Sequence, residues 1–192
     1  PSWRHYQVKD TGRRATFQAG LVGEKANQYL KPFKRRLGPS PASINAAKIS
    51  GIVANNASGM SYGKINNSYH TITGMRLILY DGTILDTRNE ESRTQFLRKH
   101  SAMADQLQKL AEKAKNNAEI REKIIHKYRL KNTTGYGVNS LVDYDDPVDI
   151  LMHLMVGSEG TLAFISEVEF ETIPDEPVKA TALLYFADIV TA

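Results

Sequence analysis

The sequence predicts an α+β fold in which a mixed or antiparallel sheet is flanked by helices and carries a helical insertion. Three observations indicate this class. Short apolar stretches flank turn residues near both ends of the chain, a long segment between them has helical spacing, and glycine-rich stretches join the two. With 192 residues, of which 41% are apolar and 24% charged, the chain has the composition of a globular domain.

The first ninety residues predict two hairpins separated by a helix and a loop. The stretches WRHYQV and RATFQAG flank KDTGR, which places Gly12 in a turn. LVGEKANQYLKPF has helical spacing up to Pro32, and GPSPAS is a rigid loop because its two prolines fix φ and remove backbone donors. GMRLILYDGTILDT predicts two strands that meet at the dipeptide Asp81-Gly82.

The second half predicts helices followed by strands. From Glu90 to about Tyr128, apolar residues recur at helical spacing and the basic residues lie largely off that stripe. DDPVDILMHLMVG predicts another helix, with Pro147 in its first turn and Gly157 after its end. TLAFISEVEFETI and VKATALLYF alternate in part, and they predict two further strands separated by PDEP.

Charge is distributed unevenly along the chain. Residues 1–40 carry 9 Lys/Arg against 2 Asp/Glu, residues 90–131 carry 11 against 6, and residues 132–192 carry 1 against 11. This split predicts faces of opposite sign rather than a uniformly basic nucleic-acid binder. The absence of cysteine excludes disulfides, cysteine-ligated metal sites and a thiol nucleophile. No apolar run is long enough for a transmembrane helix.

Three glycine-rich stretches are the main functional signal: SGIVANNASGMSYG at 50–63, KNTTGYGVNS at 131–140 and GSEGTL at 157–162. Small residues let a backbone approach a ligand closely, and amides and N–H groups supply hydrogen bonds. Each stretch alone is as typical of a turn or a helix end. Because neither a P-loop lysine nor a G-x-G-x-x-G motif is present, a nucleotide site of the usual Rossmann type is not expected.

Taken in order, GPSPAS, SGIVANNASG, YG, NSYHT, MRLILYDGTILDT, NTTGYG and GSEGTLAFI resemble the FAD-binding domain of vanillyl-alcohol-oxidase type flavoenzymes. Within that superfamily the sequence is most similar to FAD-linked D-lactate dehydrogenases and related D-2-hydroxyacid dehydrogenases. The resemblance covers nearly the whole chain. It departs at Ser50, where many relatives have a glycine, and at MSYGK, where the nearest group would have cysteine.

The resemblance implies non-covalent FAD as the cofactor. The FAD pyrophosphate carries negative charge and needs several donors at short range, which the small residues from Gly51 to Gly59 would supply. The proline loop would line the flavin or ribityl side, and the backbone of Phe164 and Ile165 would contact adenine. The implied cofactor-binding residues are Pro39, Ser40, Pro41, Ala42, Ser43, Gly51, Ala54, Asn55, Asn56, Ser58, Gly59, Tyr62, Gly63, Asn67, Ser68, Gly157, Glu159, Gly160, Phe164 and Ile165.

No catalytic residue or metal ligand is assigned in this chain. His70 matches no position of covalent flavin attachment that the resemblance offers, so a hydrogen-bonded structural histidine is the favoured interpretation. The other histidines lack the spacing of a metal site. Lys131 could stabilise negative charge near a flavin, but a solvated lysine is the simpler interpretation.

The resemblance also implies a domain organisation and an activity. Residues 1–89 and 132–174 would form part of an FAD-binding core, 90–131 a helical insertion, and 175–192 the start of a substrate or cap domain. The N-terminal phosphate-loop subdomain and the cap would lie outside this chain, so the fragment alone would bind FAD weakly or not at all and would be inactive. The whole enzyme would transfer a hydride from a D-2-hydroxyacid, D-lactate first, to flavin N5 and pass electrons to a quinone or an iron–sulfur segment.

Two alternatives remain open at this point. One is another FAD-linked oxidase or reductase on the same fold. The other is a non-catalytic module whose basic helices at 98–131 bind an acidic partner or a membrane surface. No nucleic-acid partner is expected. The expected location is cytoplasmic, with peripheral attachment at the inner membrane face as a variant.

Overall fold

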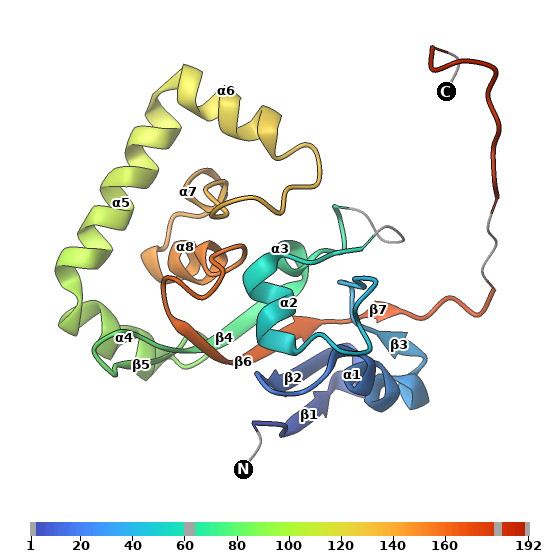
Figure 1. The fold of residues 1–192 in the computed structure, drawn as a ribbon. Coiled ribbons are helices and arrows are strands. Elements are labelled where there is room, and N and C mark those ends of the chain that lie inside the picture. Colours follow the sequence, from blue (N-terminus) through green and yellow to red (C-terminus); the bar gives the residue numbers. More distant parts are fainter. Residues whose placement is uncertain (1–2, 60–63, 179–181, 191–192) are drawn as a thin grey trace.

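A computed structural model describes residues 3–59, 64–178 and 182–190. Its centre is a five-stranded sheet in the order β1-β2-β6-β4-β5, in which every neighbouring pair is antiparallel (Figure 1). The sheet therefore combines strands from both ends of the chain. The bounds are β1 Tyr6–Lys9, β2 Arg14–Gln18, β4 Ile72–Ile78, β5 Ile84–Asp86 and β6 Phe164–Glu171; a second sheet pairs β3 Arg35–Arg36 with β7 Ile173–Pro174.

Both predicted hairpins are confirmed. The turn η1 (Asp10–Gly12) joins β1 to β2, with Gly12 at φ +89°. The second hairpin joins β4 to β5 through Asp81 and Gly82, and Gly82 has φ +80°. The side chain of Asp81 accepts a hydrogen bond from the amide of Thr83 at 3.0 Å, which fixes the turn. Turn chemistry that is local in sequence thus sets the register of both hairpins.

The helices cover one face of the sheet and extend beyond one edge of it. The short helix α2 packs on β2 and β6, while α5 runs alongside α7 and α8 (Figure 1). Val168 and Phe170 of β6 are fully buried on the helical side, and the alternating Glu167 and Glu169 point to the other side. The remaining bounds are α1 Gly23–Leu30, η2 Lys31–Phe33, α2 Ile49–Asn55, α3 Ser68–Thr71, α4 Glu90–Lys99, α5 Ser101–Asn116, α6 Ala118–Lys127, α7 Ser140–Asp143 and α8 Pro147–Leu154.

The helical predictions are confirmed for α1, for the segment α4–α6 and for α8. Asp146 is the N-cap of α8, and its carboxylate accepts from the amides of Val148 at 2.8 Å and Asp149 at 3.2 Å. The basic last turns of α4 and α5 agree with the helix dipole. The fold class predicted from the sequence, an antiparallel sheet flanked by helices with a helical insertion, is therefore the fold observed.

The sequence did not predict the helix from Ile49 to Asn55, in which Ile49, Ile52 and Val53 are buried on one side. One local prediction was wrong. The predicted strand VKATALLYF forms no strand among the described residues of that stretch, 178 and 182–186. The large side chains of this stretch are exposed, Tyr185 by 86%. Alternation of apolar and polar residues is not sufficient for a strand, which also needs a neighbouring strand to pair with.

Candidate functional site

The three glycine-rich stretches, far apart in sequence, meet at the C-terminal end of α2. The amide of Glu159 donates to the carbonyl oxygen of Ala54 at 3.0 Å, and the side-chain amide of Asn55 donates to Oε1 of Glu159 at 2.7 Å. The side-chain amide of Asn56 donates to the carbonyl oxygen of Asn132 at 3.2 Å. The C-terminal end of α2 is therefore hydrogen-bonded to both the second and the third glycine-rich stretch.

Gly157 explains why the third stretch needs glycine at its first position. Its φ is +85°, a conformation that L side chains rarely adopt, and its amide donates to the carbonyl oxygen of Val53 at 3.3 Å. A β-carbon there would lie 2.8 Å from the carbonyl oxygen of Gly135. The second and third stretches can therefore approach this closely only through a glycine.

The proline loop lies against the other end of the ANNASG segment. The amide of Ser40 donates to the carbonyl oxygen of Ser58 at 3.0 Å, and the ammonium group of Lys131 donates to the carbonyl oxygen of Gly59 at 3.3 Å. The hydroxyl of Ser58 is buried and has no hydrogen-bond partner among the described residues. Among the other residues of this loop, Pro39 and Pro41 are buried, whereas Ala42 and Ser43 are exposed.

The first turn of α2 is open on its outer side. Gly51 is exposed, and a β-carbon built on it would meet no atom of the described chain within 4 Å. The neighbouring Ser50 turns its hydroxyl toward the chain, donating to the carbonyl oxygen of Ala19 at 3.3 Å. This hydrogen bond directs the Ser50 side chain toward the chain, so that it does not cover the surface at Gly51.

Asn67 and Ser68 lie at the start of α3. The Asn67 side chain caps that helix by accepting from the amide of His70 at 3.1 Å, and its Oδ1 is 2.8 Å from Nδ1 of the His70 ring. This contact agrees with a structural role for His70. Ser68 is fully buried. Two further predicted residues, Tyr62 and Gly63, lie outside the described residues.

The predicted adenine-contacting pair lies at the start of β6. Phe164 is 50% exposed, and its ring packs edge-on against Trp3 with the ring centroids 5.5 Å apart. The side chain of Ile165 is buried in the core, where its backbone pairs with Leu77 of β4. Gly160 has φ +76° in the exposed turn that precedes β6. This pair follows the third glycine-rich stretch shortly afterwards along the chain.

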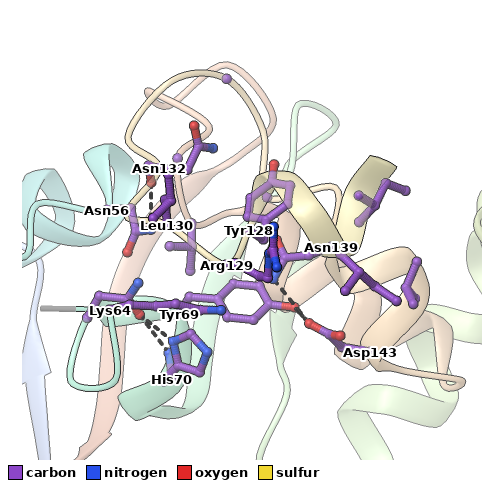
Figure 2. A pocket seen from close by; sticks show the side chains of 18 residues that line it. Asn56, Lys64, Tyr69, His70, Tyr128, Arg129, Leu130, Asn132, Asn139 and Asp143 are labelled. Carbon is purple, nitrogen blue, oxygen red and sulfur yellow. Dashed lines mark hydrogen bonds between the residues drawn. The ribbon is translucent and has the colours of Figure 1, made fainter. Parts of the chain in front are cut away.

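A cavity of about 220 Å³ opens beside the glycine-rich cluster, between the end of the helical insertion and α3 (Figure 2). It includes three of the predicted residues, Asn56, Asn67 and Gly157. Four more lining residues, Asn132, Gly135, Gly137 and Asn139, belong to the second glycine-rich stretch, and the others were not predicted from the sequence to bind the cofactor. Its other polar or aromatic lining residues include Lys64, Tyr69, Tyr128, Arg129, Asn132, Asn139 and Asp143.

Tyr69 and Asp143 form the central hydrogen bond of this cavity. The Tyr69 hydroxyl donates to Oδ2 of Asp143 at 2.7 Å, and the side-chain amide of Asn139 donates to the same oxygen at 3.1 Å. Burial of the phenol, followed by its hydrogen bond to the Asp143 carboxylate, raises the pKa of Tyr69 far above its usual value. Tyr69 is therefore neutral at physiological pH and acts as a donor.

Two histidines flank this pair without forming a metal or nucleophile site. Burial, and then the nearby Lys64, lowers the pKa of His70 below its usual value. Burial also lowers the pKa of His153, whose ring stacks on Tyr144 with the centroids 4.0 Å apart and whose Nε2 lies 2.8 Å from the Tyr144 hydroxyl. In the described residues no group of three or more His, Asp or Glu side chains is placed to hold a metal ion.

Sequence reasoning missed this cavity because its central contacts are long-range. Tyr69 and Asp143 are separated by 74 positions, and no periodicity or motif connects them. In the sequence alone, Tyr69 is interpreted as an apolar neighbour of a strand, and Asp143 as a member of an acidic run. The one available signal was that YH follows NNS, a capping pattern that places Tyr69 at the start of a short helix.

The comparisons with known proteins bear on the cofactor and on the fold. Residues 3–88 match the sequence profile of the FAD binding domain family. These residues belong to an FAD-binding domain. The FAD-binding segment thus includes the first hairpin, the proline loop, α2 and the second hairpin, which together hold most of the residues predicted to bind the cofactor.

The relatives of the whole chain include named dehydrogenases. The chain is 31% identical to the D-2-hydroxyglutarate dehydrogenase of Pantoea ananatis over 187 residues, covering 89% of this chain and 17% of that protein. It is 32% identical to the enzyme of that name from Haemophilus influenzae over 164 residues, covering 81% and 16%. The cytochrome-linked mitochondrial D-lactate dehydrogenase 1 of Saccharomyces cerevisiae is 25% identical over 177 residues, covering 92% and 21%. The chain thus spans a small part of each relative.

A solved structure supports the fold. Alkyldihydroxyacetonephosphate synthase matches with a TM-score of 0.50 at 16% identity, over 90% of this chain and 21% of that one. Together these findings confirm the resemblance to the FAD-binding domain of vanillyl-alcohol-oxidase type enzymes and to D-2-hydroxyacid dehydrogenases. No helix in the described ranges is long and apolar enough to cross a membrane.

The residues present fit FAD as the cofactor. A glycine inside a helix is less favourable than alanine by roughly 0.5–1 kcal/mol, and the described residues give no packing reason for a glycine at position 51. A phosphate-bearing ligand that lies against the backbone supplies one. The Ser58 hydroxyl, which has no hydrogen-bond partner in the described part of the chain, provides a buried hydrogen-bonding group close to it in sequence. Both features lie in the stretch that the family match covers.

Proposed function

We propose that this chain is the FAD-holding part of a flavin-dependent dehydrogenase that oxidises a D-2-hydroxyacid to the 2-oxoacid. The observation that carries the proposal is the meeting of the three glycine-rich stretches at the end of α2, within a chain of the FAD-binding family. Such an arrangement puts backbone and small side chains from several parts of the chain on one surface. That is what a long cofactor with a charged pyrophosphate requires.

The domain organisation forms part of the proposal. Residues 1–89 and 132–174 would form the cofactor-binding core, which is supported by β6 from the second range lying between β2 and β4 from the first. Residues 90–131 would be an insertion, since α5 packs on α7 and α8 outside the sheet. Residues 175–192 would lead to the substrate domain.

Each predicted contact has a defined part in holding the cofactor. Gly51 would let the pyrophosphate approach the backbone, and the Ser58 hydroxyl would donate to a phosphate oxygen. The loop at 39–43 would line the flavin or ribityl side, positioned by the Ser40–Ser58 hydrogen bond. The turn that contains Glu159 and Gly160 would shape the adenine end with Phe164. The exposed Lys131 would add positive charge beside Gly59.

Bound FAD would supply the oxidising group, accepting hydride at N5 from C2 of the hydroxyacid. The residues of this chain would hold and orient the cofactor, and none of them is assigned as the base. D-lactate was the substrate expected from the sequence, and relatives at 31% and 32% identity bear the name D-2-hydroxyglutarate dehydrogenase. Both acids are therefore candidate substrates. A quinone or an iron–sulfur group is proposed as the electron acceptor.

The test uses the full-length protein that contains this chain. The protein is purified, its visible flavin absorption is recorded, and the D- and L-isomers of lactate and of 2-hydroxyglutarate are added separately without oxygen. We expect the flavin absorption to bleach with a D-isomer and to remain with both L-isomers. The D-acid that bleaches it faster names the substrate. Flavin that responds to none of the four acids would contradict the dehydrogenase proposal while leaving FAD binding intact.

Cofactor binding has its own test. Ser58→Ala should weaken FAD binding by about tenfold, the loss expected for one hydrogen bond to a charged group. Ser50→Ala is the matched control, because the Ser50 hydroxyl is already bonded to Ala19 inside the chain. If both variants bind FAD as the wild type does, the pyrophosphate does not lie at Ser58.

The alternative of a basic binding module has less support from the structure. Several of the basic residues in the insertion are bonded within the chain: Lys99 pairs with Asp81 at 3.1 Å, and Lys123 with Glu119 at 2.6 Å. Lys115 contacts both Asp145 and the carbonyl oxygen of Tyr144. If the full-length protein is purified without flavin and stays colourless after FAD is added, the result would favour the basic binding module.

A further inference from the structure

We infer that Arg36 is a positioning residue for the cofactor: it orients the proline loop through the Ser40 hydroxyl and is itself held by Asp175, in the segment that follows β7. This role rests on the proposed function, because it takes the loop at 39–43 as the part that lines the flavin or ribityl side of FAD. Arg36 does not belong to the residues predicted to bind the cofactor, and it connects that loop to the segment proposed to lead to the substrate domain.

The small sheet of β3 and β7 brings these two segments together (Figure 1). The strands are antiparallel, and Arg36 lies opposite Ile173. The amide of Asp175 donates to the carbonyl oxygen of Lys34 at 2.9 Å, which ties the chain beyond β7 to the start of β3. Since β7 follows the central strand β6 after one residue, the chain that enters the proline loop is fixed to the middle of the main sheet.

The guanidinium group of Arg36 bridges the loop and the segment after β7. Its Nη2 atom donates to the hydroxyl oxygen of Ser40 at 2.9 Å, and its Nη1 atom lies 3.8 Å from Oδ1 of Asp175. The Arg36 side chain is only 15% exposed. A planar group with partners on two of its nitrogens keeps little rotational freedom, so the direction of its donor toward Ser40 is fixed.

The contact with Arg36 determines what the Ser40 hydroxyl can do. Its oxygen accepts from a cation, and its hydrogen is bonded to no acceptor among the described residues. Because hydrogen bonds in a chain polarise one another, a hydroxyl that accepts from a guanidinium group is a stronger donor. The backbone of Ser40 is already fixed by its amide, which donates to the carbonyl oxygen of Ser58 at 3.0 Å. Ser40 is thus an oriented donor for an oxygen or nitrogen atom of the cofactor.

The neighbouring Arg35 has different partners and supplies the matched control. Its Nε atom donates to Oγ1 of Thr172 at 2.6 Å, and its Nη2 atom donates to the carbonyl oxygen of the same residue. Thr172 is buried and lies between β6 and β7. Arg35 therefore stabilises the link between the two sheets, and its hydrogen bonds with the described residues do not reach the proline loop.

The experiment measures the FAD affinity of the full-length apoprotein by titration with FAD. We expect Arg36→Gln and Ser40→Ala each to weaken FAD binding by about tenfold, the loss expected for a hydrogen bond that involves a charged group. The double variant should bind FAD no more weakly than Ser40→Ala alone, because Arg36 acts through this hydroxyl. Arg36→Lys should stay within about threefold of the wild type, since an ammonium group is also a charged donor.

Three results would overturn the role of Arg36. One is additive losses from Arg36→Gln and Ser40→Ala, which would mean that the two residues act independently. Another is failure of Arg36→Lys to restore binding, since a charged donor would then not be what Ser40 needs. The third is an equal loss from Arg35→Gln, which removes the same charge from the same strand and is expected to lower the free energy of unfolding without changing FAD affinity.

Asp175→Asn decides the matter if Arg36→Gln does not fold, as judged by circular dichroism. This change removes the charge that faces Arg36 from a partly exposed position. Because such pairs contribute about 0–1 kcal/mol, FAD binding should weaken by about threefold in the wild-type background and stay unchanged in the Ser40→Ala background. An effect of the same size in both backgrounds, or in neither, would overturn the connection.

The outcomes also separate this role from the proposed function, because FAD affinity is measured without substrate. Wild-type affinity in Arg36→Gln, together with flavin bleaching by a D-acid, would reject the positioning role and keep the dehydrogenase proposal. Loss of affinity in the expected pattern, in a protein whose flavin responds to none of the four acids, would keep the role of Arg36 and reject the substrate. A full-length protein that binds no FAD would contradict both.

Discussion

Gly59 lies so close to Ser40 that a β-carbon on the glycine would stand 1.8 Å from the Ser40 carbonyl oxygen. The backbone of Gly59 also has φ +75°, where side chains other than hydrogen are strained. Two loops from different parts of the predicted cofactor surface are thereby held together by a residue without a side chain. The position of the proline loop depends on this contact.

Gly59→Ala should therefore destabilise the protein. The left-handed conformation costs a non-glycine residue about 1–3 kcal/mol, and the clash with backbone adds to that. We expect a loss of at least about 2 kcal/mol in the free energy of unfolding, measured by urea denaturation of the full-length apoprotein, together with weaker FAD binding. A stable Gly59→Ala protein with normal FAD affinity would show that the loop contact is not as described.

Gly51→Ala should have the opposite effect on stability. A β-carbon there meets nothing in the described chain, and alanine is favoured over glycine in a helix by roughly 0.5–1 kcal/mol. We expect the melting temperature of the apoprotein to stay equal or rise. FAD binding should weaken by about tenfold, because the methyl group would occupy the space proposed for the pyrophosphate. Unchanged FAD affinity would show that the cofactor does not contact this turn.

The comparison of these two glycines shows what sequence can and cannot predict here. The motif containing Gly51 and Gly59 was sufficient to predict the cofactor, because the family is defined by such local patterns. It was not sufficient to predict that Gly51 lies in a helix, since glycine and asparagine are poor helix formers and burial of Ile52 and Val53 overrides them. Hairpins were predictable because their turn residues are local.

The cavity and the C-terminal segment mark the limit of sequence reasoning. The Tyr69–Asp143 hydrogen bond depends on how α3 and α7 pack, which no local pattern encodes. The alternation in VKATALLYF satisfies the pattern of a strand, but a strand also needs a neighbour, and the described residues supply none. Which loops lie side by side, rather than which residues form loops, is the information that the structure added.

Glu169 should make stability depend on pH in the acidic range. Its burial alone would raise the pKa of its carboxyl group, but hydrogen bonds from Lys9 and Thr73 and the charge of Lys9 lower that pKa below the usual value. The folded state therefore holds its proton less tightly than the unfolded state. The stabilising contribution is complete above the unfolded pKa and is lost as the pH falls through the folded pKa.

Glu169→Gln tests this dependence. The melting temperature of the full-length variant should be lower than that of the wild type at neutral pH, and the gap should shrink as the pH falls below about 4.5. Glu171→Gln on the same strand is the control, because its side chain is exposed and forms no ion pair with the described residues. A gap for Glu169→Gln that stays constant down to strongly acidic pH would contradict the assignment.

Asp146 joins the N-terminus of α8 to α4, and its removal should be costly. Its carboxylate caps the amides of Val148 and Asp149 and also accepts from Arg93 at 2.8 Å. Loss of such a cap costs about 0.5–2 kcal/mol, and the ion pair with a half-buried arginine adds a smaller amount. We expect Asp146→Ala to lower the free energy of unfolding by about 1–2 kcal/mol in urea denaturation.

The adjacent residue provides the control for this last variant. Asp145 also carries an ion pair, with Lys115, but its side chain is 97% exposed and caps no helix. Because exposed pairs contribute about 0–1 kcal/mol, Asp145→Ala should have the smaller effect. Equal losses from the two substitutions would mean that general loss of negative charge, rather than the cap of α8, determines stability at this position. The α8 cap fixes the helix whose C-terminal end leads into Gly157, so the Asp146 variant should also weaken FAD binding.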